Sequence, residues 1–127
     1  MTPEGWKRGC LVVAGLSGAM AIGFGAYAAH GPAAASQAGQ WIDLASRYQL
    51  IHALALLAVA QFYRPGRRLY LLSGLLFTIG MFLFCGGLYA NALHLFSVGV
   101  LVPFGGTSFL MGWLALVLAA FAEGRNV

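Results

Sequence analysis

Long uncharged stretches, separated by short segments of polar residues, proline and glycine, dominate the pattern of this chain. Residues 69–122 contain no Asp, Glu, Lys or Arg. A helix rises about 1.5 Å per residue and needs roughly 20 apolar residues to cross a hydrocarbon core about 30 Å thick. The stretch is long enough to cross a bilayer twice, and it predicts two transmembrane helices joined by a tight turn.

Two further apolar stretches precede this one. Residues 9–29 are uncharged and follow Lys7 and Arg8. A signal peptide ending at residues 26–28 is the alternative, but its apolar part would exceed the usual length of about 7 to 15 residues. We therefore expect a retained first span. The expected fold is an all-α, integral membrane four-helix bundle in one domain, residues 1–127, with spans at residues 9–29, 44–63, 69–90 and 95–122.

Proline and glycine mark the boundaries between the spans. Residues 31–40 are small and polar, and Pro32 cannot continue a helix, so this segment is the longest expected loop. Residues 64–68 combine Pro65 and Gly66 with three cations. A proline–glycine pair is typical of a tight turn, and we expect a short hairpin between antiparallel helices here.

The last span contains Pro103, Gly105 and Gly106. A proline inside a helix removes one backbone donor and clashes with the preceding turn. We expect a kink or break at this point, with the freed carbonyl satisfied inside the protein because lipid offers no partner. A half-helix start that exposes backbone amides is the alternative interpretation.

The distribution of cations predicts how the chain is oriented. With four spans, one side carries all but one of the basic residues: Lys7, Arg8, Arg64, Arg67, Arg68 and Arg125. Only Arg47 falls on the other side. Because cytoplasmic loops of membrane proteins are enriched in Lys and Arg, we expect both termini in the cytoplasm of a cell with a bacterial-type inner (plasma) membrane.

Composition narrows the classes of function. The chain is 61% hydrophobic and only 8% charged, against roughly 25% charged in a soluble domain, with a net charge of +4. The basic residues flank apolar runs, which favours contact with anionic lipid headgroups at Arg64, Arg67 and Arg68 over nucleic-acid binding. Asp43 is the only acidic residue between Glu4 and Glu123, and common catalytic motifs are absent from the sequence. We therefore expect no enzyme activity and no cofactor.

Two features near the ends of spans indicate ordinary structural roles. Asp43 and Arg47 are spaced i, i+4 and predict an exposed ion pair at the start of the second span. Cys10 and Cys85 form no CxxC motif, and the topology places them in opposite halves of the membrane. A disulfide needs Cα atoms within about 7 Å, so we expect none between them.

Small residues recur at helical spacing. Gly15, Ala19 and Gly23 repeat every four residues in the first span, and Gly86 and Gly87 lie in the third. Because lipid is as apolar as Leu, helices in membranes associate largely through small residues that allow close backbone contact. We expect these stripes to pack inside the bundle, with self-association or contact with other membrane proteins as the alternative.

A group of polar side chains falls toward the outer side in this topology: His30, Tyr48, Gln49, His52 and His94. His52 is expected about one turn inside the second span. Gln49 and His52 share a helix face and should point inward, because unsatisfied polar groups are costly at membrane depth. This group is the candidate polar site.

Three interpretations of the candidate polar site remain open. His52 and Gln49 could cross-link helices by hydrogen bonds while His30 ends its helix. The group could instead form an outward-opening path for protons, ions or small solutes, because imidazole titrates near neutral pH. Haem or metal ligation would require the ring nitrogens to converge, which sequence spacing does not demonstrate.

Several short segments lie in a fixed order along nearly the whole chain: Trp41, Ala45 and Tyr48 with residues 23–26, 29–31, 52–57, 86–89, 103–106 and 109–113. Together they resemble the domain of unknown function 423 family of transmembrane protein 256-like, small four-span membrane proteins. Pro32, Gly86 and Val102 depart from the family pattern. The resemblance implies a four-helix membrane protein and supplies no activity, substrate or cofactor. The expected role is a non-enzymatic structural or accessory membrane protein.

The orientation can be tested by labelling. In a background with Cys10 and Cys85 replaced by Ala, the variant Arg67→Cys is expected to react with a membrane-impermeant maleimide only after the cells are opened. The control variant Gln37→Cys should react in intact cells. Labelling of Arg67→Cys from outside would contradict the predicted orientation and the shared outer location of the histidines.

Overall fold

The computed structural model describes residues 2–31, 34–97 and 99–123. Every regular element in them is helical: α1 (Pro3–His30), α2 (Gln37–Phe62), α3 (Arg68–Gly80), the π-helical turn η1 (Met81–Cys85), α4 (Gly86–Ala92) and α5 (Leu101–Glu123). Because α3, η1 and α4 follow one another without a gap, they make one continuous rod. In the described residues, four helices are long and apolar enough to cross a membrane. The expected all-α, four-span fold is confirmed.

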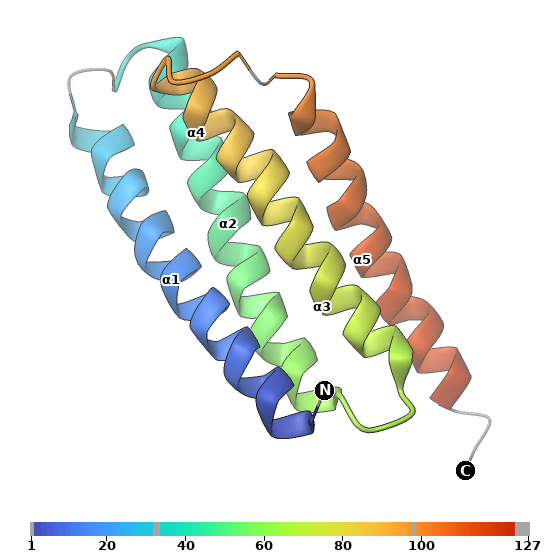
Figure 1. Cartoon of the computed structure of the whole chain (residues 1–127). Coiled ribbons are helices and arrows are strands. Elements are labelled where there is room, and N and C mark those ends of the chain that lie inside the picture. The colour runs from blue at the N-terminus through green and yellow to red at the C-terminus, as the bar shows by residue number, and fades with distance from the viewer. Residues whose placement is uncertain (1, 32–33, 98, 124–127) are drawn as a thin grey trace.

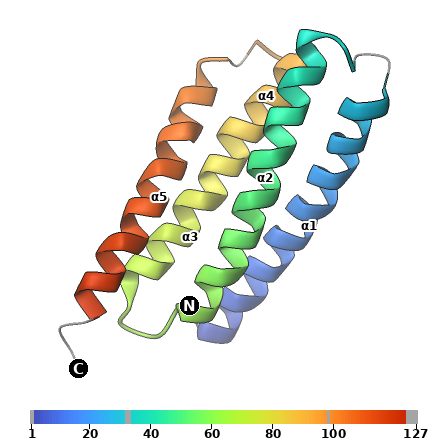
Figure 2. The ribbon, with the colours of Figure 1, turned by 180° about the vertical axis from the view of Figure 1, so that it is seen from behind.

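The helices lie side by side in the order α1, α2, α3 with α4, then α5 (Figures 1 and 2). Helix α1 packs along α2, and α5 packs along α3 and η1, while α2 contacts both α3 and α4. The chain runs up and down, and the start of α1 lies at the same end as the α2–α3 hairpin and the end of α5 (Figure 1). Helix α2 and the α3–α4 rod therefore form the centre of the bundle.

Capping side chains move two helix starts away from the expected positions. The Thr2 hydroxyl accepts a hydrogen bond from the Gly5 amide at 3.0 Å, and α1 begins at Pro3. The Ser36 hydroxyl caps α2 in the same way, accepting from the Gly39 amide at 3.2 Å. Both helices thus begin before the expected spans, which start at residues 9 and 44, because Ser and Thr satisfy the free amides of a first turn. Pro32, in the intervening loop, lies outside the described residues.

The α2–α3 hairpin has the expected proline–glycine turn. The Arg67 amide donates to the Arg64 carbonyl at 3.0 Å, and Gly66 has φ +90°. A turn with proline at its second position and positive φ at its third requires glycine there, because other residues rarely adopt that backbone conformation. The turn reverses the chain within a few residues.

The expected kink at Pro103 is wrong. Helix α5 begins at Leu101, so Pro103 lies in its first turn, where backbone amides have no helical partner to lose. Gly105 and Gly106 continue the same helix. The segment 93–100, which hydropathy alone joins to the last span, makes the connection between α4 and α5, apart from Val98, which lies outside the described residues.

The contact between α1 and α2 consists mostly of small residues. On α1 the buried positions recur at intervals of three, four or seven residues: Cys10, Ala14, Ser17, Ala21 and Ala28. On α2 they include Gly39, Ala45, Ser46 and Ala53. This spacing is typical of helices that pack nearly parallel to one another, and small residues bring the two backbones close.

The expected stripe on α1 does not take part in this contact. Gly15, Ala19 and Gly23 are exposed, and a Cβ atom added at Gly15 or Gly23 would have open space around it. Gly86 is likewise exposed with open space, while Gly87 is buried. Packing of the stripe and of Gly86 inside the bundle is therefore wrong. The face of α1 that contacts α2 is the neighbouring one, which carries Ala14, Ala21 and Ala28.

The second small-residue seam belongs to α5. Its buried positions facing α3 and η1 recur every three or four residues: Gly105, Ser108, Gly112, Ala115 and Ala119. A Cβ atom at Gly112 would lie 2.6 Å from the Phe77 ring, and one at Gly105 would collide with the backbone of Phe84. The Ser108 hydroxyl adds a hydrogen bond of 2.7 Å to the Leu76 carbonyl. These residues let α5 lie directly against the rod.

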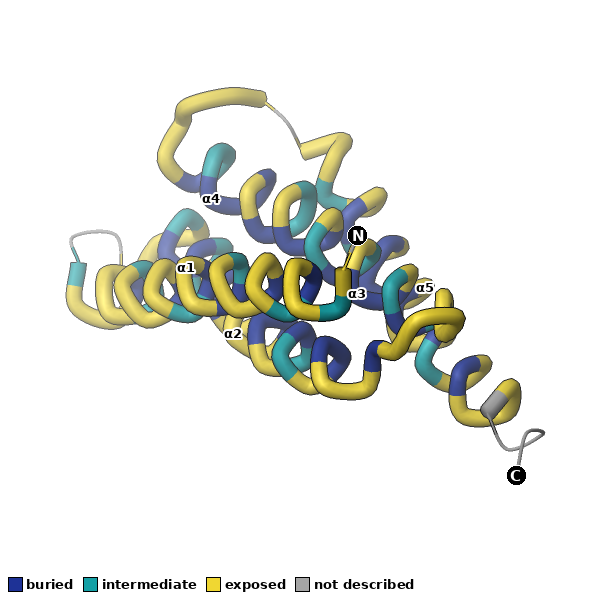
Figure 3. The backbone as a smooth tube through the Cα atoms, turned by 60° about the horizontal axis from the view of Figure 1, so that its bottom comes forward, coloured by how far each residue is buried: buried dark blue, intermediate teal, exposed yellow. Residues whose placement is uncertain are grey.

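The outside of the bundle is apolar around its middle. Buried and exposed positions alternate around the helices (Figure 3), and exposed side chains near the middle of the helices include Leu54, Phe82 and Leu110, which are 61%, 82% and 60% exposed. Such a surface suits lipid. In the described residues, the exposed cations Arg8, Arg64, Arg67 and Arg68 lie at the end of the bundle that holds the hairpin. Arg125 lies outside the described residues.

Two glycine variants distinguish a glycine in close contact with a neighbouring helix from a glycine on the open surface. Gly105→Leu is expected to destabilise the protein by about 1–3 kcal/mol or more, because the new side chain would have to displace the Phe84 backbone. Gly23→Leu should leave stability unchanged or slightly raised, because leucine favours helix and meets nothing there. The measurement is the thermal midpoint of helix loss in detergent, followed by circular dichroism. Equal midpoints for the two variants would contradict the packing described for α5.

Candidate functional site

The centre of the candidate polar site lies on α2, at Gln49 and His52. Their side chains are 5% and 3% exposed, which confirms that both point inward. His52 lies fifteen residues beyond the start of α2 at Gln37, or roughly 22 Å along the helix axis. It is therefore deep in the bundle rather than one turn inside the span, because capping by Ser36 extends α2 outward.

Both nitrogens of His52 have partners. Nδ1 lies 2.7 Å from the Tyr48 carbonyl oxygen, one helical turn earlier, and the Trp113 indole N–H donates to Nε2 at 3.1 Å. A carbonyl can only accept and an indole N–H can only donate. The proton of the neutral ring must therefore be on Nδ1, and protonation of Nε2 would require the Trp113 hydrogen bond to break. This pair of contacts fixes one tautomer and links α2 to α5.

Aromatic rings enclose the imidazole. The Phe109 ring stacks on it with centroids 3.6 Å apart, and Phe77 meets it edge-on at 5.3 Å. Tyr48 extends the stack, with its ring 4.9 Å from Phe84 and 6.1 Å from Phe109. These residues come from α2, α3, η1 and α5, so the aromatic cluster around the histidine joins four elements. The contacts leave its two nitrogens with fixed partners.

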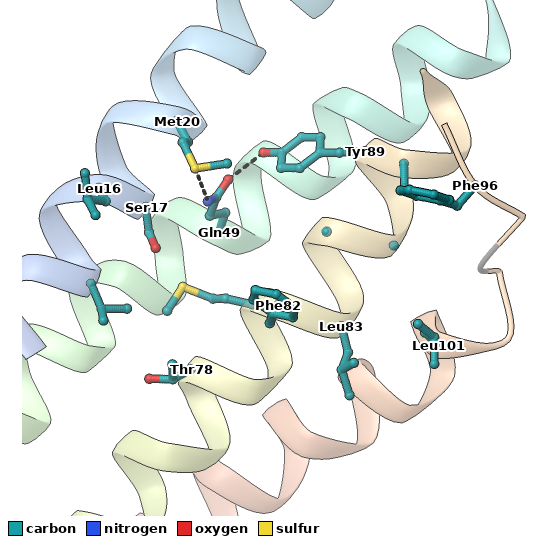
Figure 4. Close-up of a pocket in the computed structure, with 15 residues that line it drawn as sticks. Leu16, Ser17, Met20, Gln49, Thr78, Phe82, Leu83, Tyr89, Phe96 and Leu101 are labelled. Carbon is teal, nitrogen blue, oxygen red and sulfur yellow. Dashed lines mark hydrogen bonds between the residues drawn. The ribbon is translucent and has the colours of Figure 1, made fainter. Parts of the chain in front are cut away.

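Gln49 makes a separate set of contacts, with side chains of α4 and α1 (Figure 4). The Tyr89 hydroxyl donates to Gln49 Oε1 at 2.6 Å, and Gln49 Nε2 lies 3.9 Å from Met20 Sδ. The Tyr89 ring stacks on Phe24 of α1 at 4.2 Å. The amide thereby connects α2 to α4 and α1. Gln49 and His52 share a helix face, but Gln49 contacts α4 and α1 whereas His52 contacts α5.

The structure does not bring the three histidines together. His30 is the last residue of α1 and His94 follows α4, and both are exposed near the end of the bundle remote from the hairpin. His94 has φ +57° in the turn after α4, and its amide donates to the Asn91 carbonyl at 3.2 Å. Tyr48 alone of the other predicted residues lies beside His52. The candidate polar site thus separates into a buried centre and two peripheral histidines.

The arrangement gives little support to a metal site. Within the parts of the chain that the structure describes, no three His, Cys, Asp or Glu side chains lie together as metal ligands would. A ligating histidine needs one nitrogen free to bind, and both nitrogens of His52 are already engaged. Cys10 and Cys85 are buried free thiols, as expected, and form no bridge.

The predicted ion pair is present. Arg47 Nη2 and Asp43 Oδ2 are 2.9 Å apart, one helical turn from each other on α2. Their side chains are 72% and 46% exposed, so the pair is accessible rather than part of the buried centre. Pairs of this kind are worth under about 1 kcal/mol in water. The contact fits a role at the headgroup level.

Sequence reasoning missed the partners of the two buried polar groups. Trp113, Phe109 and Tyr89 contact His52 or Gln49 in space but are distant from them along the chain. The spacing of Phe109 and Trp113, i and i+4 on one helix face, was an available signal for a shared contact. Nothing in the sequence alone indicates which helix that face meets.

Four membrane-length helices, an apolar exterior and polar side chains that form hydrogen bonds between the helices define a small multi-pass membrane protein. The chain belongs to the family described as protein of unknown function (DUF423), whose model matches residues 24–106. It is 39% identical over 118 residues to a UPF0382 membrane protein of Haemophilus influenzae, covering 91% of this chain and 95% of that protein.

Other relatives have the same length and character. The UPF0382 inner membrane protein YgdD of Escherichia coli is 34% identical over 126 residues, covering 94% of this chain and 95% of its own. A UPF0382 membrane protein of Staphylococcus saprophyticus is 34% identical over 115 residues, covering 87% and 95%. No solved structure matches the chain. These relatives confirm the family and the location in the inner (plasma) membrane.

The link between His52 and Trp113 can be measured with a double-mutant cycle. His52→Phe and Trp113→Phe keep aromatic packing but remove the hydrogen bond. We expect a coupling energy of about 0.6 kcal/mol, and no more than about 1.7, as for other hydrogen bonds between membrane helices. The measurement is the free energy of unfolding in mixed detergent micelles. A cycle of His52→Phe with Trp41→Phe is the control and should be additive; additivity in both would contradict the contact.

Proposed function

We propose that this protein is a non-enzymatic accessory membrane protein that binds a transmembrane helix of another membrane protein. The observation that carries the proposal is the outward face of α1. Gly15, Gly18 and Gly23 have open space where a Cβ atom would lie, and Ala19 is exposed between them. Small residues on an unoccupied face serve no packing within the chain, yet they allow a second helix to approach closely in a membrane.

The rest of α1 supports this role. The helix packs along α2 through its alanine face, and large apolar side chains flank the open stripe: Leu11 at 62%, Leu16 at 64% and Ile22 at 67% exposed. A partner helix lying on the glycines would be bordered by these side chains on both sides. The stripe would then set the distance between backbones and the flanking residues would fill the remaining space.

The buried polar centre supports a non-enzymatic role. His52 and Gln49 both bind side chains of this bundle, and Asp43 is paired with Arg47. Catalysis by general acid–base chemistry needs a titratable group within hydrogen-bond reach of a substrate. The transporter alternative needs a group that exchanges partners along a path, and the two nitrogens of His52 are held by Tyr48 and Trp113. Cross-linking of helices is the role that these contacts favour.

The proposal includes the orientation of the chain. Both termini would lie in the cytoplasm, and Arg64, Arg67 and Arg68 would contact anionic headgroups of the inner leaflet. All three side chains are exposed at the hairpin. Contact with lipid there would fix the depth of the bundle while the face of α1 remains available to a partner.

The test uses a photo-crosslinking amino acid placed at Ala19 in living cells. We expect an adduct with another membrane protein that is lost when Gly15→Leu and Gly23→Leu are added, because two leucines would hold a partner helix away. The same amino acid at Leu118, which is 58% exposed on α5, is the control and should give no adduct. Absence of an adduct at Ala19, an adduct that the leucines leave intact, or an adduct with a second copy of this chain would each overturn the proposal.

A further inference from the structure

A cavity opens between α1 and the rod made by α3, η1 and α4. It has a volume of about 630 Å³ and is lined almost entirely by apolar side chains, among them Leu16, Met20, Phe82 and Leu101 (Figure 4). Volumes of 300 to 1,000 Å³ are typical of small-molecule sites. A transmembrane helix is about 10 Å across and would not enter a space of this size.

The cavity contains polar groups in an otherwise apolar wall. Gln49 lies among the lining residues and is 5% exposed, and its carbonyl oxygen accepts the Tyr89 hydroxyl. A primary amide also carries two N–H donors. The contact found for this nitrogen is the Met20 sulfur at 3.9 Å, which is a weak acceptor. Gln49 can therefore donate a hydrogen bond to an oxygen atom placed inside the cavity.

The depth of Gln49 limits what that oxygen can belong to. It lies twelve residues from the start of α2 and thirteen from its end, roughly 18–20 Å along the axis from either. Asp43, whose ion pair fits the headgroup level, precedes Gln49 by six residues, so Gln49 lies roughly 9 Å below that level, within a hydrocarbon region about 30 Å thick. Phospholipid ester carbonyls lie at the headgroup level and would not reach it. The acceptor must belong to a molecule whose polar part is itself buried in the membrane.

We propose that this cavity binds a lipophilic carbonyl compound of the prenylated quinone type, whose ring oxygen accepts a hydrogen bond from Gln49 Nε2. Aromatic side chains in the lining, including Phe82 and Phe96, offer surfaces for a flat ring and for an unsaturated tail. Phe82 is 82% exposed at the mouth of the cavity, which opens sideways between α1 and the rod. A ligand can enter from the lipid without crossing water.

Gly86 provides a way to fill the cavity without disturbing the fold. It lines the cavity, and a Cβ atom there has open space. Gly86→Leu should therefore occupy part of the volume while the helices keep their positions. Gly9→Leu is the matched control, because Gly9 of α1 also has open space but lies outside the lining and outside the stripe of Gly15, Ala19 and Gly23.

The experiment measures the thermal midpoint of the detergent-solubilised protein with decylubiquinone as the probe. A ligand bound to the native state raises this midpoint in a saturable way. We expect a rise of about 5 °C at saturation for the natural chain and for Gly9→Leu, and none for Gly86→Leu. Decylbenzene, which has an apolar body without carbonyl groups, should bind about tenfold more weakly because it leaves the Gln49 donor unused.

Each other outcome overturns the proposal. Equal effects of decylubiquinone and decylbenzene would show a cavity that accepts any apolar chain, and an unchanged response in Gly86→Leu would place the probe elsewhere. If Gly86→Leu does not fold, a photoreactive analogue of the quinone decides the matter in the natural chain. Labelling should fall on residues 13–20 and 78–90, and labelling confined to other residues would exclude this site.

Discussion

Close contact between helix backbones is the interaction on which the rest of this structure depends. In lipid, burying one leucine against another gains little, so helices associate where small residues allow dispersion contacts and hydrogen bonds between backbones. The alanine face of α1 meets α2, and the glycine, serine and alanine face of α5 meets the central rod. Gly105 is the tightest point, since α5 there touches the backbone of Phe84. The two seams thus hold the outer helices α1 and α5 against the central pair.

Once the seams have set the distances, a few polar side chains connect the helices in pairs. His52 joins α2 to α5 through Trp113, and Gln49 joins α2 to α4 through Tyr89. Each group lies within an apolar bundle, where an unsatisfied donor or acceptor is costly. The histidine has both nitrogens engaged, whereas the amide keeps donor capacity beside a cavity. The same helix face therefore carries His52, whose hydrogen-bonding groups are all used, and Gln49, whose amide can still donate to a ligand.

The sequence predicts the number of spans, their antiparallel order, the proline–glycine hairpin and the inward direction of Gln49 and His52, because each follows from local hydropathy or turn chemistry. The expected kink at Pro103 does not arise, because a proline in the first turn of a helix removes no helical hydrogen bond. Hydropathy likewise does not separate residues 93–100 from α5. The sequence also selects the wrong glycine stripe, since Gly15 and Ala14 are neighbours and both faces carry small residues. Which face meets a partner, and hence that Trp113 reaches His52, depends on the tertiary fold.

The π-helical turn η1 changes what the rod can contact. Before η1 in the chain, α3 packs against α5, and after η1, α4 packs mainly against α2. A π-helical turn holds one more residue than an α-helical turn, so it shifts the angular phase of everything that follows by about 100°. A regular α-helix of the same sequence, without the π-helical turn, would carry the Tyr89 hydroxyl away from Gln49 while keeping Phe77 in place. The extra residue thus allows one continuous rod to pack against α5 through α3 and against α2 through α4, on different sides.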